Sequence, residues 1–275
     1  ELLAGTLRAL QKRTALDTEQ VYDAVFGCVT QTGEQGGNIG KAASLLAGWS
    51  PHMSAVTINR FCASGLSAVN LASLQARDSD GLVLAGGVEM MSRVPMFGDK
   101  PSYVGDKTLA STIGFVPPPW SSDLVATRQG YSRTDCDTYA ALSQSRALAA
   151  RDAGLAHSMV PVTDAQGNIL LAQDENIRAG STVEKLAGLR TVYEDGANGL
   201  DAWGLAREPA LGSIQHVHTA GNAPCMADGA AAVLLGTKAA AQRLGLSTRA
   251  RILAHADACV ELTQTGAVDA TRKAL

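Results

Sequence analysis

The chain has 275 residues, of which 46% are apolar and 18% charged, so it can bury the core of one large domain or two ordinary ones. Its 23 Lys and Arg residues against 26 Asp and Glu residues give a net charge of −3, which excludes the basic balance typical of nucleic-acid-binding proteins. No apolar run approaches the roughly 20 residues of a membrane-spanning helix, and the first residues lack the pattern of a signal or transit peptide. We therefore expect a cytoplasmic protein with no nucleic-acid or membrane partner.

The first 94 residues alternate between helical and strand patterns. Leu3, Leu7 and Leu10 have helical spacing with no cap before them, so an upstream element is expected to be missing. Apolar runs then predict strands at 24–29, 55–58 and 81–85, and helices at 39–49 and 63–76. This alternation predicts an α/β sheet, and the strand at 81–85, apolar on both faces, belongs in its middle.

The pattern changes from about Pro95 to His218, where prolines, charges and isolated helical patches replace the alternation. Such a stretch indicates a large insertion between parts of a sheet. Within it, Ser132 and Asp135 fit a capping box at the start of a helix that runs to Asp152. After it, the sequence predicts a strand at 230–235, a helix at 237–244, a new strand at 251–255 and a further helix by 271–275.

The five cysteines are widely spaced and contain no C-x-x-C pair, which argues against a disulfide framework or a zinc site. His216 and His218 stand at alternate positions of a predicted strand, but two histidines without a third ligand do not define a metal site. We expect no bound metal.

One cysteine stands out by its position. Cys62 lies where a predicted buried strand passes into a helix rich in small residues. Unpaired backbone N–H groups and the helix dipole favour an anion at a helix N-terminus, so the thiolate form is favoured there. The small residues at 63–65 leave room for a substrate carbonyl, and the Cys62 N–H is placed to donate to an oxyanion. The residues alone leave two interpretations open, a nucleophile or an inert buried cysteine.

Two long segments resemble the nucleophile region of degradative thiolases. They are Asn59-Arg-Phe-Cys-Ala-Ser-Gly-Leu66 and Leu82-Val-Leu-Ala-Gly-Gly-Val-Glu-Met-Met-Ser-Arg-Val-Pro-Met96. The segments Thr219-Ala-Gly-Asn-Ala223 and Asp228-Gly-Ala-Ala-Ala-Val-Leu-Leu235 are similar to the second marker of that family. The resemblance covers nearly the whole chain.

Within the family, the strings Asn59-Arg-Phe-Cys62 and His216-Val-His-Thr219 most resemble the thiolase subunit of fatty-acid oxidation complexes. The resemblance implies thiolytic cleavage of a 3-ketoacyl-CoA through an acylated cysteine, or the reverse Claisen condensation. Coenzyme A is then a substrate, and no permanently bound cofactor is implied.

The resemblance also implies site residues. Cys62 corresponds to the acylated nucleophile, and Arg178 to an arginine along the CoA nucleotide, where a guanidinium suits both phosphate and adenine. A solvated loop arginine is the alternative for Arg178. Ala220 and Pro224 fall in the CoA-binding loop, although Pro224 stands where the family commonly has a serine hydroxyl, so its contact would be made through shape or its carbonyl.

The family architecture implies a layered α/β/α/β/α fold. It assigns 1–94 and 219–246 to the N-terminal half, 95–218 to a loop domain covering the CoA site, and 247–275 to the start of a truncated C-terminal half. The family's Gly-His-Pro and Cys-x-Gly-Gly motifs, which supply its base and its acid cysteine, do not occur in the chain, so none of its five histidines is assigned the base role.

The partners implied are acyl-CoA and CoA, a second copy of the chain in a homodimer or tetramer, and a hydratase/dehydrogenase subunit. The alternative function is a non-catalytic thiolase-like protein that binds acyl-CoA or serves as a structural subunit. A ketoacyl synthase fits less well, because its cysteine lies in a different string and it lacks the long insertion.

Overall fold

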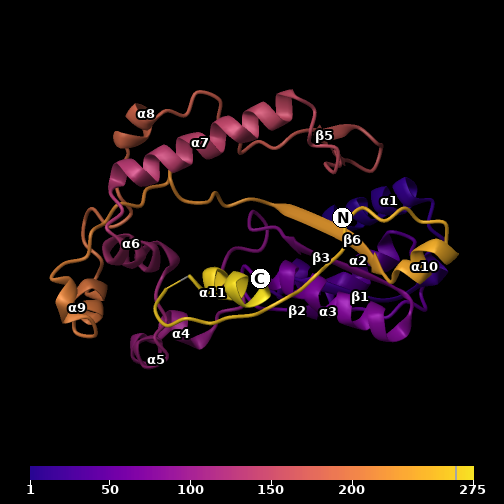
Figure 1. Ribbon diagram of the computed structural model, residues 1–275, viewed down its shortest axis with the longest axis horizontal. Coiled ribbons are helices and arrows are strands. Elements are labelled where there is room, and N and C mark those ends of the chain that lie inside the picture. The colour runs from indigo at the N-terminus through magenta and orange to yellow at the C-terminus, as the bar shows by residue number, and fades with distance from the viewer. Residues whose placement is uncertain (264) are drawn as a thin grey trace. The chain divides into compact units, whose positions relative to one another are not determined.

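The computed structural model describes residues 1–263 and 265–275, which divide into two compact units (Figure 1). Unit 1 comprises residues 1–100, 160–173 and 226–253, and unit 2 comprises residues 101–159, 174–225 and 254–275. This division does not test the predicted arrangement of two halves with an inserted domain, which stays a prediction.

Unit 1 is built on a four-stranded mixed sheet. Its strands are β1 (Val21–Gly27), β2 (Val56–Ile58), β3 (Leu82–Glu89) and β6 (Gly229–Gly236), in the order β2-β1-β3-β6. β1 runs parallel to β2 and β3, whereas β6 is antiparallel to β3. The predicted α/β class is confirmed, and so is the interior position of β3, because it pairs with β1 on one side and with β6 on the other.

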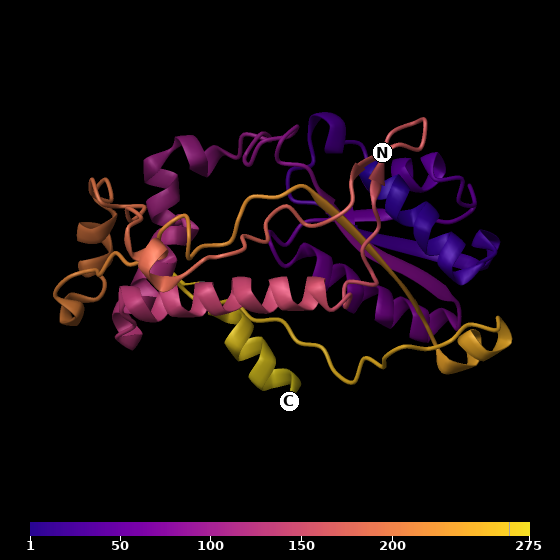
Figure 2. The same ribbon diagram turned by 90° about the horizontal axis from the view of Figure 1, so that it is seen from above.

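Helices cover both faces of this sheet (Figure 2). α1 (Leu2–Thr14) and α2 (Ile39–Leu46) pack on one face, against side chains such as Phe26 and Leu84. α3 (Ser64–Ser79) packs on the other face, where Ala68, Ala72 and Ala76 meet Val25 and Val83. The assignment follows from strand geometry, because successive side chains of β1 and β3 point to opposite faces.

The remaining elements of unit 1 are short. They are η1 (Thr18–Gln20), η2 (Gly33–Gln35), the hairpin of β4 (Val162–Thr163) and β5 (Ile169–Leu171), and α10 (Lys238–Arg243). Asp228, before β6, accepts hydrogen bonds from the backbone N–H and the hydroxyl of Ser92, after β3. This contact ties together two motifs that lie 136 residues apart in the sequence.

Unit 2 is mainly helical, and its helices are α4 (Ser102–Gly105), α5 (Lys107–Thr112), α6 (Pro118–Gln129), α7 (Arg133–Asp152), α8 (Val183–Ala187), α9 (Leu200–Leu205), η3 (Pro209–Leu211) and α11 (Gly266–Ala274). α6 begins within the run of prolines, which suit the first turn of a helix because their missing N–H needs no partner there. The predicted capping box of α7 is confirmed, since Ser132 and Asp135 bond each other's backbone. The core of the unit gathers around Trp120, Leu124 and Ile214.

Two sequence predictions about strands are wrong. Residues 251–255 form no strand, and Leu253 is 78% exposed, because no strand among the described residues pairs with this apolar run. His216 and His218 likewise lie outside any strand, and a ring nitrogen of each contacts the Asp123 carboxylate. The helix predicted at 271–275 is present and begins earlier, at Gly266.

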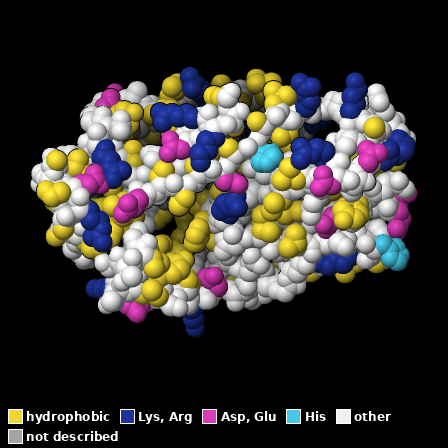
Figure 3. Space-filling model, turned by 60° about the horizontal axis from the view of Figure 1, so that its bottom comes forward, with side chains coloured by type: hydrophobic (Ala, Val, Ile, Leu, Met, Phe, Trp, Pro, Cys, Tyr) yellow, Lys and Arg dark blue, Asp and Glu magenta, His cyan; other side chains and the backbone are white. Residues whose placement is uncertain are grey.

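The molecular surface carries charges of both signs. On the face shown in Figure 3, basic and acidic side chains are interspersed with apolar ones rather than gathered by sign. This mixture agrees with the near-balanced charge of the sequence. Within the described part of the chain, no helix combines the length and the apolar character needed to cross a membrane.

Gly27 allows the first turn of α3 to lie directly on the end of β1. A Cβ at this position would stand 2.6 Å from the Ser64 carbonyl carbon and 2.7 Å from the Gly65 nitrogen, both backbone atoms that cannot move alone. We expect Gly27→Ala to lower the free energy of unfolding by about 1–3 kcal/mol, because α3 must shift away from the sheet. Urea denaturation measures the change.

Gly5→Ala is the matched control, because a Cβ at Gly5 in α1 meets no atom within 4 Å. This control is expected to raise stability by up to about 1 kcal/mol through helix propensity. Equal midpoints for Gly27→Ala and the unmodified protein would contradict the close contact.

Candidate functional site

The structure places Cys62 in a tight turn between β2 and α3. β2 ends at Ile58, α3 begins at Ser64 with Ala63 as its N-cap residue, and the Cys62 side chain is exposed. The alternative of a buried cysteine therefore does not describe Cys62. Its position before a helix of 16 residues matches the position expected from the sequence.

The turn that presents Cys62 is strained. Phe61 has a φ of +47°, a left-handed conformation that is rare for a bulky residue. Neighbouring side chains hold it there: the Asn59 Oδ1 atom accepts the Phe61 N–H at 2.7 Å, and the Ser64 hydroxyl donates to the Phe61 carbonyl at 2.6 Å. The Asn59 amide also donates to the Val29 carbonyl at 3.0 Å, which ties the turn to the segment after β1. Strain held by such contacts is typical of functional sites.

Cys28, at the end of β1, lies in the opposite environment. It is buried, and burial together with the nearby Glu89 carboxylate raises the pKa of its thiol to about 12. The same carboxylate accepts hydrogen bonds from the Gln35 amide at 2.7 Å and from the Val29 N–H at 2.8 Å. Cys28 is thus a protonated packing residue, unlike the exposed Cys62.

The other predicted site residues lie in unit 2. Ala220 and Pro224 are exposed in the loop that starts at Thr219. The Asn222 side chain closes this loop, because its Oδ1 accepts the Thr219 N–H at 2.8 Å. The Asn222 amide nitrogen donates to the Asp137 carboxylate of α7 at 2.9 Å. The loop is therefore fixed to α7, while its two candidate CoA-contact residues face outward.

Arg178 lies in a second loop fixed to the same helix. Its backbone N–H donates to the Gln144 side chain of α7 at 2.7 Å. The Arg178 side chain is exposed and has no hydrogen-bond or ion-pair partner among residues 1–263 and 265–275. Its guanidinium is available to a ligand.

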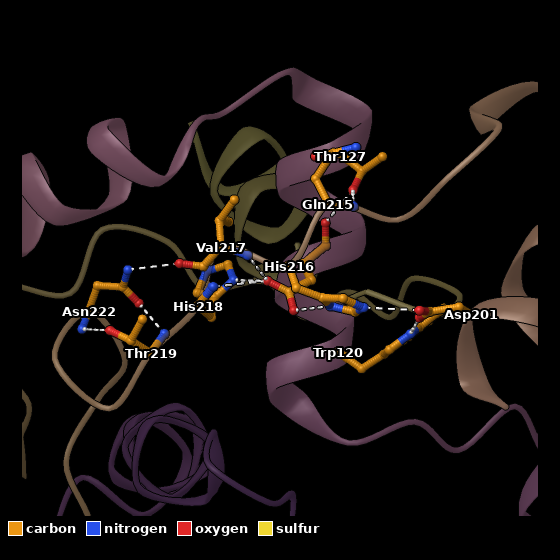
Figure 4. Close-up of polar contacts among 10 residues, drawn as sticks. Trp120, Thr127, Asp201, Gln215, His216, Val217, His218, Thr219 and Asn222 are labelled. Carbon is orange, nitrogen blue, oxygen red and sulfur yellow. Dashed lines mark hydrogen bonds and ion pairs between the residues drawn. The ribbon is translucent and has the colours of Figure 1, made fainter. Parts of the chain in front are cut away.

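A cluster of titratable side chains around the buried Asp123 precedes the loop at Thr219 (Figure 4). The Asp123 carboxylate, fully buried on α6, interacts with His216 Nδ1 at 2.7 Å and with His218 Nδ1 at 2.6 Å. His216 Nε2 lies 3.0 Å from the Asp201 carboxylate, which also accepts the Trp120 indole N–H at 2.8 Å. His216 has no ring nitrogen left for a metal in this arrangement.

Electrostatics shifts the pKa values of two groups in this cluster in opposite directions. Burial opposes ionisation of Asp123, but hydrogen bonds from His218, His216 and two backbone N–H groups outweigh it and lower its pKa below 3.8. Burial likewise opposes protonation of His216, but its bonds to Asp123 and Asp201 outweigh burial and raise its pKa above 6.5.

Sequence reasoning noticed the two histidines but missed their carboxylate partners. Asp123 precedes His216 by 93 residues and Asp201 precedes it by 15, and no local pattern links the three. The signal for this cluster in the sequence was the pair of histidines beside the Thr-Ala-Gly-Asn motif. Across the described ranges, no group of three or more His, Cys, Asp or Glu side chains is arranged to hold a metal ion.

An exposed, helix-terminal thiol over a mixed sheet flanked by helices fits the class of cysteine-dependent acyltransferases. Residues 1–199 match the model of the thiolase N-terminal domain. The whole chain is 38% identical to 70% of the 3-oxoadipyl-CoA/3-oxo-5,6-dehydrosuberyl-CoA thiolase of Escherichia coli. The whole chain is also 36% identical to the β-ketoadipyl-CoA thiolase of Pseudomonas aeruginosa, of which it covers 70%. A 3-ketoacyl-CoA thiolase of Colwellia psychrerythraea is 36% identical over 97% of the chain and 66% of that protein.

The chain belongs to the thiolase family, as its motifs indicated. The names of the first two relatives point to adipyl-type substrates and not to fatty acids. The predicted similarity to the thiolase subunit of fatty-acid oxidation complexes therefore remains a hypothesis.

Iodoacetamide is expected to label Cys62 faster than the other four cysteines, because a thiolate at a helix N-terminus is stabilised and this one is exposed. Cys28 should react last, since with a pKa of about 12 roughly one molecule in ten thousand carries its thiolate at about pH 8. Peptide mass spectrometry after short labelling times measures each rate. The exposed Cys225 and Cys259 are internal controls, and labelling of Cys62 at their rate would remove the case for an activated thiol.

Proposed function

We propose that this protein transfers acyl groups between a Cys62 thioester and coenzyme A by thiolase chemistry. The observation that supports this most directly is the strained Phe61 turn, which holds an exposed thiol at the start of α3. A structural cysteine would not need a left-handed bulky residue before it, nor two side chains to hold that residue in place.

In the cleavage direction, the Cys62 thiolate attacks the 3-keto carbon of a 3-oxoacyl-CoA and forms a tetrahedral oxyanion. The bond between carbons 2 and 3 then breaks, its electron pair leaves as the acetyl-CoA enolate, and carbon 2 takes up a proton. The shortened acyl group remains on Cys62 as a thioester. A free CoA thiolate attacks this thioester and releases both the acyl-CoA and the Cys62 thiolate. We assign the proton-transfer steps to no residue of this chain.

The names of the relatives bear on the substrate. Two of them act on 3-oxoadipyl-CoA or β-ketoadipyl-CoA, so a 3-oxoacyl-CoA ending in a second carboxylate is our first candidate substrate. The Colwellia relative and the Asn59-Arg-Phe-Cys62 string favour a fatty 3-ketoacyl-CoA as the second.

We further propose that Arg178, Ala220 and Pro224 contact CoA. Their two loops are fixed to α7 through Gln144 and Asp137, which are seven residues apart. Seven residues are two helical turns, so both anchors lie on one face of α7, about 10 Å apart along its axis. This spacing suits a long ligand with a charged nucleotide at one end, because Arg178 carries a cation and Ala220 offers a small, uncharged surface.

The family also suggests partners and a location. We propose that the protein is cytoplasmic, holds no permanent cofactor, and acts as a homodimer or tetramer, with a hydratase/dehydrogenase subunit as a candidate partner.

Incubation with 3-oxoadipyl-CoA or acetoacetyl-CoA is expected to leave an acyl group on Cys62, because this thiol is exposed directly before the long helix α3. Acid quenching and peptide mass spectrometry measure acylation and identify the acyl group. We expect acylation at Cys62 to exceed that at Cys225 by about ten-fold or more, and Cys62→Ala to remove it.

Equal acylation at the two cysteines would favour the alternative of a non-catalytic acyl-CoA-binding protein. Repeated turnover with added CoA by these 275 residues is expected to be slow, and rapid turnover would place a base within them. Preferential acylation by a long-chain 3-ketoacyl-CoA would favour the fatty-acid substrate.

Arg178→Ala is expected to weaken CoA binding about ten-fold, the loss typical of one charge-assisted contact to phosphate, and to leave Cys62 labelling unchanged. Calorimetric titration with CoA measures the dissociation constant. Arg146→Ala, which changes an arginine on α7, is the control. Its dissociation constant for CoA should match that of the unmodified protein. An unaltered dissociation constant in Arg178→Ala would reject this contact.

A further inference from the structure

His216 is held as an imidazolium by two carboxylates. Its Nδ1 lies 2.7 Å from Asp123 and its Nε2 lies 3.0 Å from Asp201. A neutral imidazole has only one N–H and would direct a lone pair at one of these carboxylates. Figure 4 draws both contacts of His216 as dashed lines. Since both neighbours are acceptors when ionised, the ring must carry both protons to make both bonds.

The carboxylates themselves are committed to this arrangement. Asp123 accepts the backbone N–H groups of Val217 and His218, at 3.0 and 3.1 Å, in addition to the two rings. With four donors around a fully buried carboxylate, Asp123 stays ionised at neutral pH. Asp201 is oriented by the Trp120 indole, so it cannot turn away from His216 without losing that bond.

This cluster holds the beginning of the loop that carries the proposed CoA contacts. Asp123 accepts the backbone N–H groups of Val217 and His218, directly before Thr219. Asp137 accepts a hydrogen bond from the side chain of Asn222, three residues after Thr219. Ala220 lies between these two attachments. The first attachment depends on charge balance within the cluster, because deprotonated His216 would leave two carboxylates facing each other with no cation between them.

We propose that His216 is a positioning residue for CoA: in its protonated form it fixes the loop 219–224, and when it loses its proton the loop loosens and CoA binds more weakly. The inference rests on the proposed function, in which this loop contacts CoA. His216 itself touches no reacting atom.

The other titratable groups around His216 support the direction of the effect. Tyr193 packs its ring against His216, with centroids 5.3 Å apart, and burial followed by the charge of Asp123 raises the pKa of its phenol above 10, so it stays neutral. His218 donates to Asp123, and Cys136 has a raised pKa through burial and its acidic neighbours, of which Asp123 is one. Neither the phenol of Tyr193 nor the thiol of Cys136 supplies a second cation that would replace the imidazolium.

The sign of the pH dependence follows from the raised pKa of His216. The contribution of the imidazolium to loop order is complete below the unfolded value of about 6.5 and is lost as pH rises through the higher folded value. The lowered pKa of Asp123 acts at the other end, where its contribution is lost only as pH falls below about 3.8. CoA affinity should therefore decline on the alkaline side of neutrality.

The decisive variant is Asp201→Asn, which keeps the shape of the side chain and an oxygen acceptor but removes one of the two negative charges. Desulfo-CoA is the probe, because it lacks the thiol that titrates in the same range. Its dissociation constant is measured by calorimetry from about pH 6.5 to about pH 9, and NMR follows the imidazole of His216 in the same samples. His157→Gln, which removes an exposed histidine of unit 2, is the matched control.

We expect the affinity of the unmodified protein to fall about ten-fold across the His216 titration, with the midpoint of the fall at the NMR pKa. Asp201→Asn should move both midpoints together to lower pH, and His157→Gln should move neither. A variant that merely destabilises the fold would lower affinity at every pH without moving the midpoint.

A pH-independent affinity in the unmodified protein, or an unmoved midpoint in Asp201→Asn, would overturn the positioning role while leaving the thiolase proposal intact. Failure of the unmodified protein to bind desulfo-CoA at any pH would instead reject the CoA contact of the loop, and the positioning role with it. The NMR titration in Asp201→Asn also stands alone, because an unchanged His216 pKa would show that Asp201 does not hold the proton.

Discussion

The close contact between Gly27 and the first turn of α3 is the constraint on which the candidate nucleophile depends. Because no Cβ stands between β1 and the backbone of Ser64 and Gly65, the helix can begin directly over the sheet. The chain must then reach that point within a few residues of the end of β2, and it does so through a left-handed Phe61. The strain of that residue and the exposure of Cys62 are two results of the same geometry.

Local patterns explain why much of unit 1 could be predicted from the sequence. β3 and α3 each carry a periodicity that one element imposes by itself, and the Ser132–Asp135 capping box needs only four residues. The strand expected at 251–255 failed because a strand exists only where another strand pairs with it, and an apolar run does not reveal its partner. The placement of Cys62 before a helix was predictable for the same local reason, but the φ of Phe61 was not.

The His216 cluster shows the opposite limit. Its carboxylates come from α6 and from α9, and the spacing of residues in the sequence carries no trace of their meeting. The histidines were visible beside the Thr219 motif, and two histidines alone suggested either a metal pair or structural residues. Only the positions of Asp123 and Asp201 show that one ring lies between two carboxylates. Buried charge networks are specified by tertiary packing, and sequence periodicity reports secondary structure.

An imidazolium differs from the other cations that might balance two carboxylates. A lysine or arginine in its place would remain charged through the whole physiological range, and the backbone leading into the loop 219–224 would then be held under all conditions. Histidine makes the same two bonds with a proton that can leave, since its pKa, although raised by Asp123 and Asp201, starts from 6.5. The fully buried Asp123 cannot follow by taking up that proton easily, because its backbone and His218 donors still favour the anion. The charge lost with the His216 proton is therefore not replaced within the cluster, and the backbone that Asp123 holds at Val217 and His218 leads directly into the loop with Ala220.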